Sequence, residues 1–199
     1  MEFNINCYIQ HPNYNPTNPL FLNNPEIQYI NINNERGIKE IVINHKDFDT
    51  IYVPMTITIS VNGSCLLGFE LDSGLSIWDD YISATEELLV AGKVIQHYGI
   101  EPVLLQMEML EKNHVFFCIY DEFEPDKRYI EEIFSAKDFL SNLVSEIKYF
   151  LYKLKSYGAL ERSTSCEEGR LRMEDEFSSF MDNIKRVELL EEKIKSYFN

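Results

Sequence analysis

The side chains with the clearest chemical potential in this sequence are carboxylates, and they are concentrated in its middle third. Residues 61–126 contain thirteen acidic and two basic residues, so this segment carries −11 of the formal net charge of −15. Glu70 and Asp72 are two positions apart and would share one face of a strand, while Asp79 and Asp80 follow the only tryptophan. General acid–base catalysis needs paired carboxyls whose pKa values are driven apart by burial or like charge. Spacing alone does not provide this, so a binding role is the simpler interpretation.

Two aromatic residues stand among these acids. Trp78 and Tyr81 are three positions apart, so on a turn or helix they would lie on the same side, beside Asp79 and Asp80. Trp and Tyr are over-represented among the residues that dominate protein interfaces, and the neighbouring carboxylates would suit a basic partner. The alternative is that both rings cap one end of the core. The predicted partner-binding residues are Trp78, Asp79, Asp80, Tyr81, Asp72, Asp121, Glu122 and Glu124.

No motif for a metal, a nucleotide or an activated nucleophile accompanies these carboxylates. His114 and Cys118 would share a strand face, but zinc needs about four ligands, usually in local pairs. The acidic segment 121–126 contains Pro125 and no glycine, unlike a calcium-binding EF-hand loop. The sequence contains no G-x-S-x-G, no S-x-x-K and no phosphate-binding glycine pattern. We therefore expect no catalytic residue, no metal and no cofactor, and we predict that the protein is not an enzyme.

Length, charge and cysteine usage limit the class and location of the protein. The chain of 199 residues suits one domain, or one domain with an appendage, and its 45% hydrophobic content predicts a folded core. The acidic balance argues against nucleic acid or an anionic membrane as a partner. No stretch reaches the ~18 uninterrupted apolar residues that a membrane span needs. The four cysteines lie about fifty residues apart, which suggests buried free thiols in a reducing compartment. We expect a cytoplasmic protein.

The N-terminal segment, residues 1–50, is rich in asparagine and proline and is expected to be extended. Its prolines predict a loop over residues 11–19, because each proline disfavours helix at the position before it. Short extended segments are predicted around this loop, at residues 3–9, 26–32 and 38–44.

Two hairpins are predicted in the middle of the chain. Asn62-Gly63 supplies the positive φ angles of a type I′ turn between two strand-like segments, which is the strongest local signal in the chain. Residues 102–110 and 114–120 predict a second hairpin, followed by a strand over residues 128–134. Between the hairpins, Ser83 and Glu86 have the spacing of a capping box and predict a short helix that begins at Ser83 and ends at Gly92.

Two long helices are predicted in the remaining sequence. Apolar residues at helical spacing run from Phe139 to Leu154, and Ser135 and Asp138 resemble a cap. A second stripe reaches Phe198 after a possible cap at residues 165–168, and the short linker 159–164 favours an antiparallel pair. Packing on the first helix is one role for the second stripe. The other is a homodimer interface formed by Phe177, Phe180, Ile184 and Val187.

The predicted fold is therefore α+β. Antiparallel hairpins form a meander that packs against a long amphipathic helix, and a second long C-terminal helix completes an αα-hairpin. We divide the chain into an α+β domain of residues 1–160, which includes the extended N-terminal segment, and a C-terminal helical appendage of residues 161–199.

Three functional hypotheses remain open. The leading hypothesis is a small acidic interaction module whose carboxylates engage a basic protein. An immunity or antitoxin-like inhibitor of a cationic toxin is a concrete version, because carboxylates steer fast association with a basic partner. The second hypothesis is a motif-poor enzyme that uses carboxylates between Asp72 and Asp80. The third is a homo-oligomeric scaffold held together by the C-terminal helix.

Overall fold

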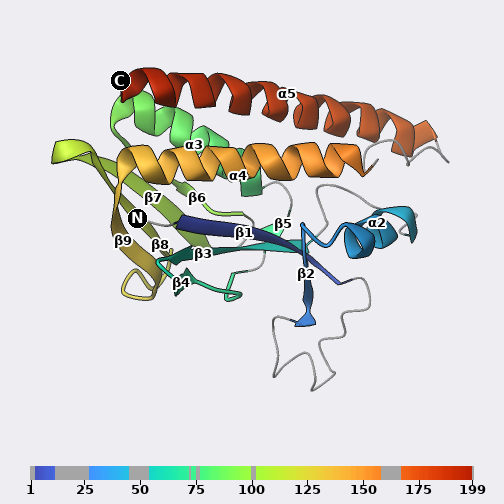
Figure 1. The fold of residues 1–199 in the computed structure, drawn as a ribbon, viewed down its shortest axis with the longest axis horizontal. Coiled ribbons are helices and arrows are strands. Elements are labelled where there is room, and N and C mark those ends of the chain that lie inside the picture. The colour runs from blue at the N-terminus through green and yellow to red at the C-terminus, as the bar shows by residue number, and fades with distance from the viewer. Residues whose placement is uncertain are drawn as a thin grey trace.

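A computed structural model describes most of the chain as two antiparallel sheets and a layer of helices (Figure 1). The described residues are 3–11, 27–44, 54–71, 73–74, 77–99, 102–157 and 167–198, with backbone alone for 42–44, 112 and 167–180. The elements are β1 (Phe3–Gln10), β2 (Tyr29–Asn31), α2 (Glu35–Asn44), β3 (Pro54–Val61), β4 (Ser64–Leu67), β5 (Ser73–Gly74), α3 (Ile77–Ala91), β6 (Lys93–His97), β7 (Val103–Leu110), η2 (Glu111–Asn113), β8 (His114–Asp121), β9 (Arg128–Ser135), α4 (Ala136–Ser156) and α5 (Glu167–Tyr197).

The first sheet has the strand order β2-β1-β3-β4, and β5 pairs with the start of β3. Every pairing in it is antiparallel. The hairpin predicted at Asn62-Gly63 is confirmed: the φ angles are 49° and 81°, as a type I′ turn requires, and Val61 pairs with Ser64. Alternate residues of β1 are buried (Ile5, Cys7 and Ile9), so one face of this sheet contributes to the core.

The second sheet is a meander with the order β6-β7-β8-β9. The predicted second hairpin is confirmed as β7 and β8, joined by the 3₁₀ turn Glu111–Asn113 in which Asn113 has a φ of 61°. The strand predicted over 128–134 is confirmed as β9. Alternation along β7 buries Val103, Leu105 and Met107, while the residues between them are only partly covered. One face of this sheet therefore packs on the core and the other does not.

The helices cover the packed faces of both sheets. α4 contacts β1, β8 and β9, α3 contacts β6 and β7, and α5 lies over α3 and α4 (Figure 1). The predicted apolar stripe of α4 is confirmed, because Phe139, Leu143 and Phe150 are fully buried. Phe139 stacks on Phe134 with 4.7 Å between ring centroids, and Phe3 of the first sheet meets Phe134 at 5.2 Å. The two sheets thus share one core beneath α4.

The long C-terminal helices form the predicted αα-hairpin. α4 and α5 run antiparallel side by side (Figure 1), and the α+β class with antiparallel strands is confirmed. Ile184, Val187, Leu190 and Ile194 of α5 are buried in the same core as the sheets. The predicted division at residue 160 and the predicted cap at Ser165 both fall outside the described residues.

Two local predictions are wrong. Residues 38–44 belong to the helix α2 rather than to an extended segment. Its Ile38 and Ile41 are buried on one face, Lys39 pairs with Glu35 at 2.6 Å, and Asn34 Oδ1 accepts a hydrogen bond from the Gly37 N–H at its start. The predicted extended segment 26–32 contains the shorter strand β2, and residues 12–19 of the predicted loop lie outside the described residues.

The second wrong prediction concerns the start of α3, which begins at Ile77 rather than at Ser83. The Ser83 hydroxyl does not cap a helix: it accepts a hydrogen bond from Arg186 Nη2 at 2.9 Å. The helix starts earlier because its first turns bury Ile77 and Trp78 against the core. The predicted end at Gly92 is confirmed, with a φ of 76° in the left-handed region that glycine tolerates. Ser135 precedes α4 as predicted, but its side chain makes no capping hydrogen bond.

Candidate functional site

The side of the second sheet that faces away from the helices is the surface we call the outer face. On the opposite side, Val94 is buried and Gln96 Nε2 donates to the Asp80 carbonyl of α3 at 2.8 Å. Strand alternation and the pairing registers place the outer residues in three rows across the four strands, and a register shift between Ile119 and Tyr120 sets Arg128 opposite Tyr120. The rows are Lys93–Glu108–Phe116–Ile133, Ile95–Gln106–Cys118–Glu131 and His97–Leu104–Tyr120–Arg128.

The outer face combines exposed apolar side chains with mutually paired charges. Ile95 is 49% exposed and Ile133 is 55% exposed, although both lie on strands. Lys93 Nζ lies 2.7 Å from Glu108 Oε2, and Arg128 forms an ion pair with Glu131. The charges within the rows therefore neutralise one another, and the apolar groups between them stay accessible.

A hollow of about 380 Å³ lies on this face. Its floor is Cys118, which is 3% exposed and whose thiol lies 4.0 Å from Glu131 Oε2. Burial raises the pKa of the Cys118 thiol, against the smaller opposing effect of Arg128, so the thiol stays protonated and unreactive at neutral pH. The residues that line the hollow are Gln106, Phe116, Cys118, Tyr120, Pro125, Arg128 and Glu131.

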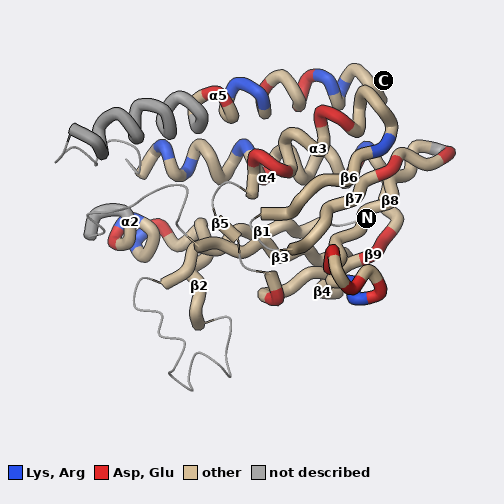
Figure 2. Tube along the Cα trace, turned by 180° about the vertical axis from the view of Figure 1, so that it is seen from behind, with Lys and Arg blue, Asp and Glu red and all other residues tan. Residues whose placement is uncertain are grey.

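The loop between β8 and β9 lies at one end of the outer face and carries acidic and basic positions close together (Figure 2). Asp121 organises this loop: its Oδ1 accepts hydrogen bonds from the N–H groups of Phe123 and Glu124, both at 3.0 Å. These backbone bonds, first of all that of Glu124, lower the pKa of Asp121, and Lys127 contributes at 3.4 Å. Asp121 is thus a structural residue of the loop rather than an exposed contact, since only 15% of its side chain is exposed.

The other predicted carboxylates of this loop are exposed. Glu122 Oε2 lies 3.9 Å from His97 Nδ1, so the two would pair when the imidazole is protonated. Glu124 and Asp126 make no ion pair with any described residue. Between Glu122 and Glu124 lies Phe123, which is 78% exposed. The structure therefore brings an exposed aromatic ring and unpaired carboxylates together at the rim of the outer face.

The predicted aromatic anchor requires a correction. Trp78 is 1% exposed and Tyr81 is fully buried, so neither ring is accessible to a partner. Trp78 packs on Phe150 of α4 at 5.7 Å between centroids, and Tyr81 meets Tyr98 edge-on at 5.6 Å. Helical spacing correctly indicated that the two rings share a side of α3. That side faces the core because amphipathic burial stabilises the helix there.

Asp79 and Asp80 also have partners inside the chain. Asp80 Oδ2 accepts a hydrogen bond from the Gly99 N–H at 2.8 Å and so holds the turn after β6, while burial raises the pKa of this carboxyl. Asp79 Oδ1 lies 3.3 Å from Arg186 Nη1 of α5. Asp72 lies outside the described residues, and Glu70 accepts a hydrogen bond from the Gly68 N–H at 2.8 Å. Glu70, Asp79 and Asp80 are therefore each bound within the chain.

Arg186 of α5, which the sequence patterns did not indicate as a site residue, binds carboxylates of α3. Arg186 Nη2 lies 2.7 Å from Glu86 Oε2, and the same guanidinium reaches Asp79, Ser83 and Asn183. Interaction with Glu86 raises the pKa of Arg186, which keeps it charged. Arg186 is 100 positions from Glu86, so no local pattern could have indicated the pairing.

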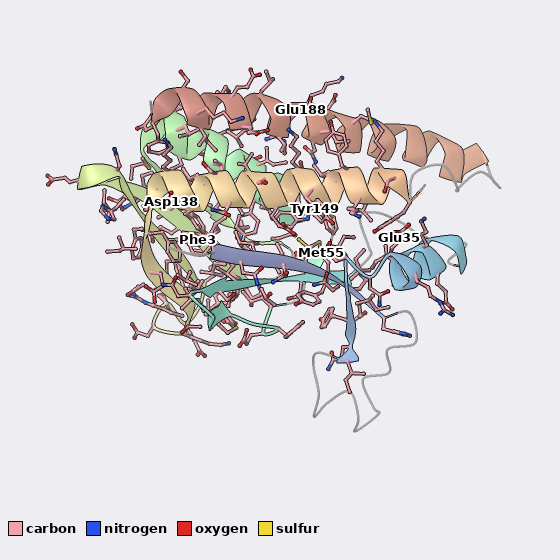
Figure 3. The ribbon with its side chains drawn as sticks, viewed as in Figure 1. Phe3, Glu35, Met55, Asp138, Tyr149 and Glu188 are labelled. Carbon is pink, nitrogen blue, oxygen red and sulfur yellow. The ribbon has the colours of Figure 1, made fainter. Side chains whose placement is uncertain are left out.

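The structure describes the side chains of two of the four residues of the predicted homodimer interface. Ile184 and Val187 are 5% and 0% exposed, which corrects their assignment to an intermolecular surface, because both pack inside the chain. Phe177 and Phe180 belong to α5, but their side chains lie outside the described residues. Polar contacts reinforce the packing of α5: Tyr152 Oη donates to Glu188 Oε1 at 2.5 Å, and Glu188 lies on α5 above the α4 segment that carries Tyr149 (Figure 3).

The cysteines and histidines do not assemble into a metal site within the described residues, where no three His, Cys, Asp or Glu side chains converge. Cys7, Cys65 and Cys118 are free thiols, and Cys65 is exposed rather than buried as expected. Cys7 is fully buried, and its thiol donates to Glu146 Oε1 at 3.6 Å. Burial raises the pKa of both groups. Cys166 lies in a segment of the chain that the structure does not describe.

Comparison with known proteins adds no functional assignment. No family model, no curated protein and no solved structure matches the chain. None of the helices in the described ranges combines the length and apolar character that crossing a membrane requires.

Proposed function

We propose that this protein is a protein–protein interaction module that engages a basic partner through the outer face of its second sheet and the β8–β9 loop. The observation that carries the proposal is the exposed cluster at that rim. Phe123, Glu124 and Asp126 lie there beside a sheet face whose Ile95 and Ile133 are about half exposed. Exposed apolar groups on one sheet face, beside an acidic loop, are characteristic of interaction sites.

The charge of this rim favours a basic partner. Residues 121–128 contain four acidic residues and two basic residues, Lys127 and Arg128, so their net charge is −2. Lys127 is paired with Asp121 and Arg128 with Glu131, which leaves Glu124 and Asp126 available. The whole chain, including this loop, has a net charge of −15. This charge attracts cations and repels anions over a Debye length of about 8 Å at physiological salt.

An immunity or antitoxin-like inhibitor remains the concrete form of this proposal. Such an inhibitor presents carboxylates to the cationic surface of a toxin and associates rapidly because opposite charges steer the encounter. The acidic loop supplies the charge and Phe123 supplies an apolar contact within it. Asp79 and Asp80 do not support this role, since Arg186 and Gly99 already bind them.

The test is affinity capture from lysate of the native host, at low and at high salt, with wild-type protein and charge-reversed variants. The double variant Glu122→Lys/Glu124→Lys changes the net charge by four and should abolish capture of a basic protein that the wild type binds stoichiometrically. The matched control Glu87→Lys/Glu192→Lys makes the same change on exposed helix positions and should retain capture. High salt should weaken the wild-type complex.

Two results would contradict the proposal. One is capture that survives reversal of the loop charges. The other is the absence of any stoichiometric basic protein at either salt concentration. Circular dichroism of all variants should match that of the wild type, because both pairs of residues are exposed.

A further inference from the structure

The hollow on the outer face has the lining of a cation site. Phe116 and Tyr120 stand on either side of Cys118 along β8, and Pro125 of the β8–β9 loop closes one edge. Its volume of about 380 Å³ is near the lower end of the range of small-ligand pockets, roughly 300–1,000 Å³, and suits one long side chain. Aromatic side chains next to a carboxylate attract a cation through both the ring quadrupole and the charge.

The carboxylate of the hollow is Glu131, and the chain itself supplies a cation to it. Arg128, three residues earlier on β9, forms the ion pair with Glu131 at the edge of the hollow. The two side chains are 47% and 39% exposed. An ion pair this exposed is held weakly, because water competes for both groups and two long side chains lose conformational freedom. Another guanidinium can therefore replace Arg128 at little cost.

We propose that this hollow receives one arginine side chain of the partner, which stacks on Phe116 or Tyr120 and replaces Arg128 at Glu131. The inference rests on the proposed function and identifies the group that anchors the partner. Arginine fits better than lysine, because its planar guanidinium both stacks on aromatic rings and binds a carboxylate through two parallel hydrogen bonds.

The surroundings of the hollow exclude two other occupants. Arg128 could in principle bind an anion, but Glu131 occupies it and the neighbouring loop carries a net charge of −2. A second copy of this chain would bring two acidic loops, each on a protein of net charge −15, against one another. Charge complementarity therefore favours a cationic group of a different protein as the occupant of the hollow.

The experiment is a titration of the full-length protein with N-acetyl-argininamide, followed by the backbone amide chemical shifts in NMR. N-acetyl-glutamate and N-acetyl-glutaminamide serve as the acidic and neutral probes at equal ionic strength. The arginine probe should shift the amides of Phe116, Cys118 and Tyr120. Its affinity should fall about fivefold in Glu131→Gln and rise by a similar factor in Arg128→Gln, which removes the competing cation.

Glu132→Gln is the matched control. Glu132 is the next residue of β9, is also exposed, and pairs with Phe117, whose side chain faces the core, so this variant should bind the probe as the wild type does. Equal losses in Glu131→Gln and Glu132→Gln would overturn the inference. Binding of the acidic probe in the hollow would also overturn it. So would amide shifts that the arginine probe causes only at Glu122 and Glu124. The last outcome would not contradict the proposal that the β8–β9 loop engages a basic partner, because affinity capture tests that proposal separately.

Discussion

Replacing Arg186 by methionine tests whether the ion pairs between α3 and α5 hold the last helix on the protein. Methionine keeps much of the apolar stem and removes the guanidinium, so the change isolates the polar contacts. The guanidinium binds Glu86 through two nitrogens, at 2.7 and 3.4 Å, and reaches Asp79 at 3.3 Å. It also donates to Ser83 Oγ at 2.9 Å and to Asn183 Oδ1 at 3.2 Å.

The expected loss is about 2 kcal/mol in the free energy of unfolding. Fully exposed ion pairs contribute about 0–1 kcal/mol, and removing one partner of a fully buried pair costs about 3–5 kcal/mol. Arg186 lies between these limits, because 32% of its side chain is exposed. Glu86 and Asp79 are 32% and 40% exposed, so water can solvate both carboxylates once the guanidinium is gone. This solvation keeps the loss below that of a buried pair.

Urea unfolding followed by circular dichroism measures the effect. With a slope of about 2 kcal/mol/M, a loss of about 2 kcal/mol lowers the midpoint by about 1 M. Lys185→Met is the matched control on the same helix: Lys185 is 70% exposed and pairs only with Asp182 at 3.3 Å among the described residues. Its expected loss is about 0.3 kcal/mol.

An Arg186→Met variant whose urea midpoint equals that of Lys185→Met would contradict this prediction. Such a result would mean that the apolar contacts of Ile184, Val187 and Leu190 hold α5 without help from the guanidinium. Arg186→Lys separates charge from geometry. It should lose about half as much as methionine, because an ammonium cannot bind Glu86 through two parallel hydrogen bonds.

Two further predictions concern acid stability and the first hairpin. Hydrogen bonds from Lys148 and Lys195 lower the pKa of Glu191 to about 2, whereas its pKa in the unfolded chain is about 4.3. The stability that Glu191 contributes is therefore complete above about pH 4.3 and is lost as the pH falls towards 2. Glu191→Gln should therefore flatten the dependence of the urea midpoint on pH between about pH 4.5 and pH 2.5, and an unchanged slope would exclude Glu191 as a source of it. Gly63→Ala should cost about 1 kcal/mol, because Gly63 has a φ of 81° and open space around it, so the penalty is backbone strain alone. Ser64→Ala, at the exposed neighbouring position, should stay within about 0.5 kcal/mol of wild type in the same urea assay.

The features that could be predicted from the sequence are those decided by neighbouring residues. Asn62-Gly63 specifies its turn because only two residues need positive φ, and both can adopt it. The apolar spacing from Phe139 to Leu154 defines α4 because one helical face must be buried. Gly92 ends α3 for the same kind of local reason. In the candidate site, Glu122 and Glu124 were identified because a short acidic loop between strands has to face water.

Tertiary structure decided where the remaining charges and rings lie. Spacing placed Trp78 and Tyr81 on one side of α3, but only packing against Phe150 and Tyr98 turned that side inward. The carboxylates of α3 are adjacent in the sequence and suggest a surface for a partner, but in the folded chain Arg186 of α5 forms an ion pair with Glu86. The hollow on the outer face likewise needs strand registers and a folded loop to assemble it. Local preferences act over a few residues, whereas burial and ion pairing depend on which distant segments share one core, and that is settled only when the chain folds.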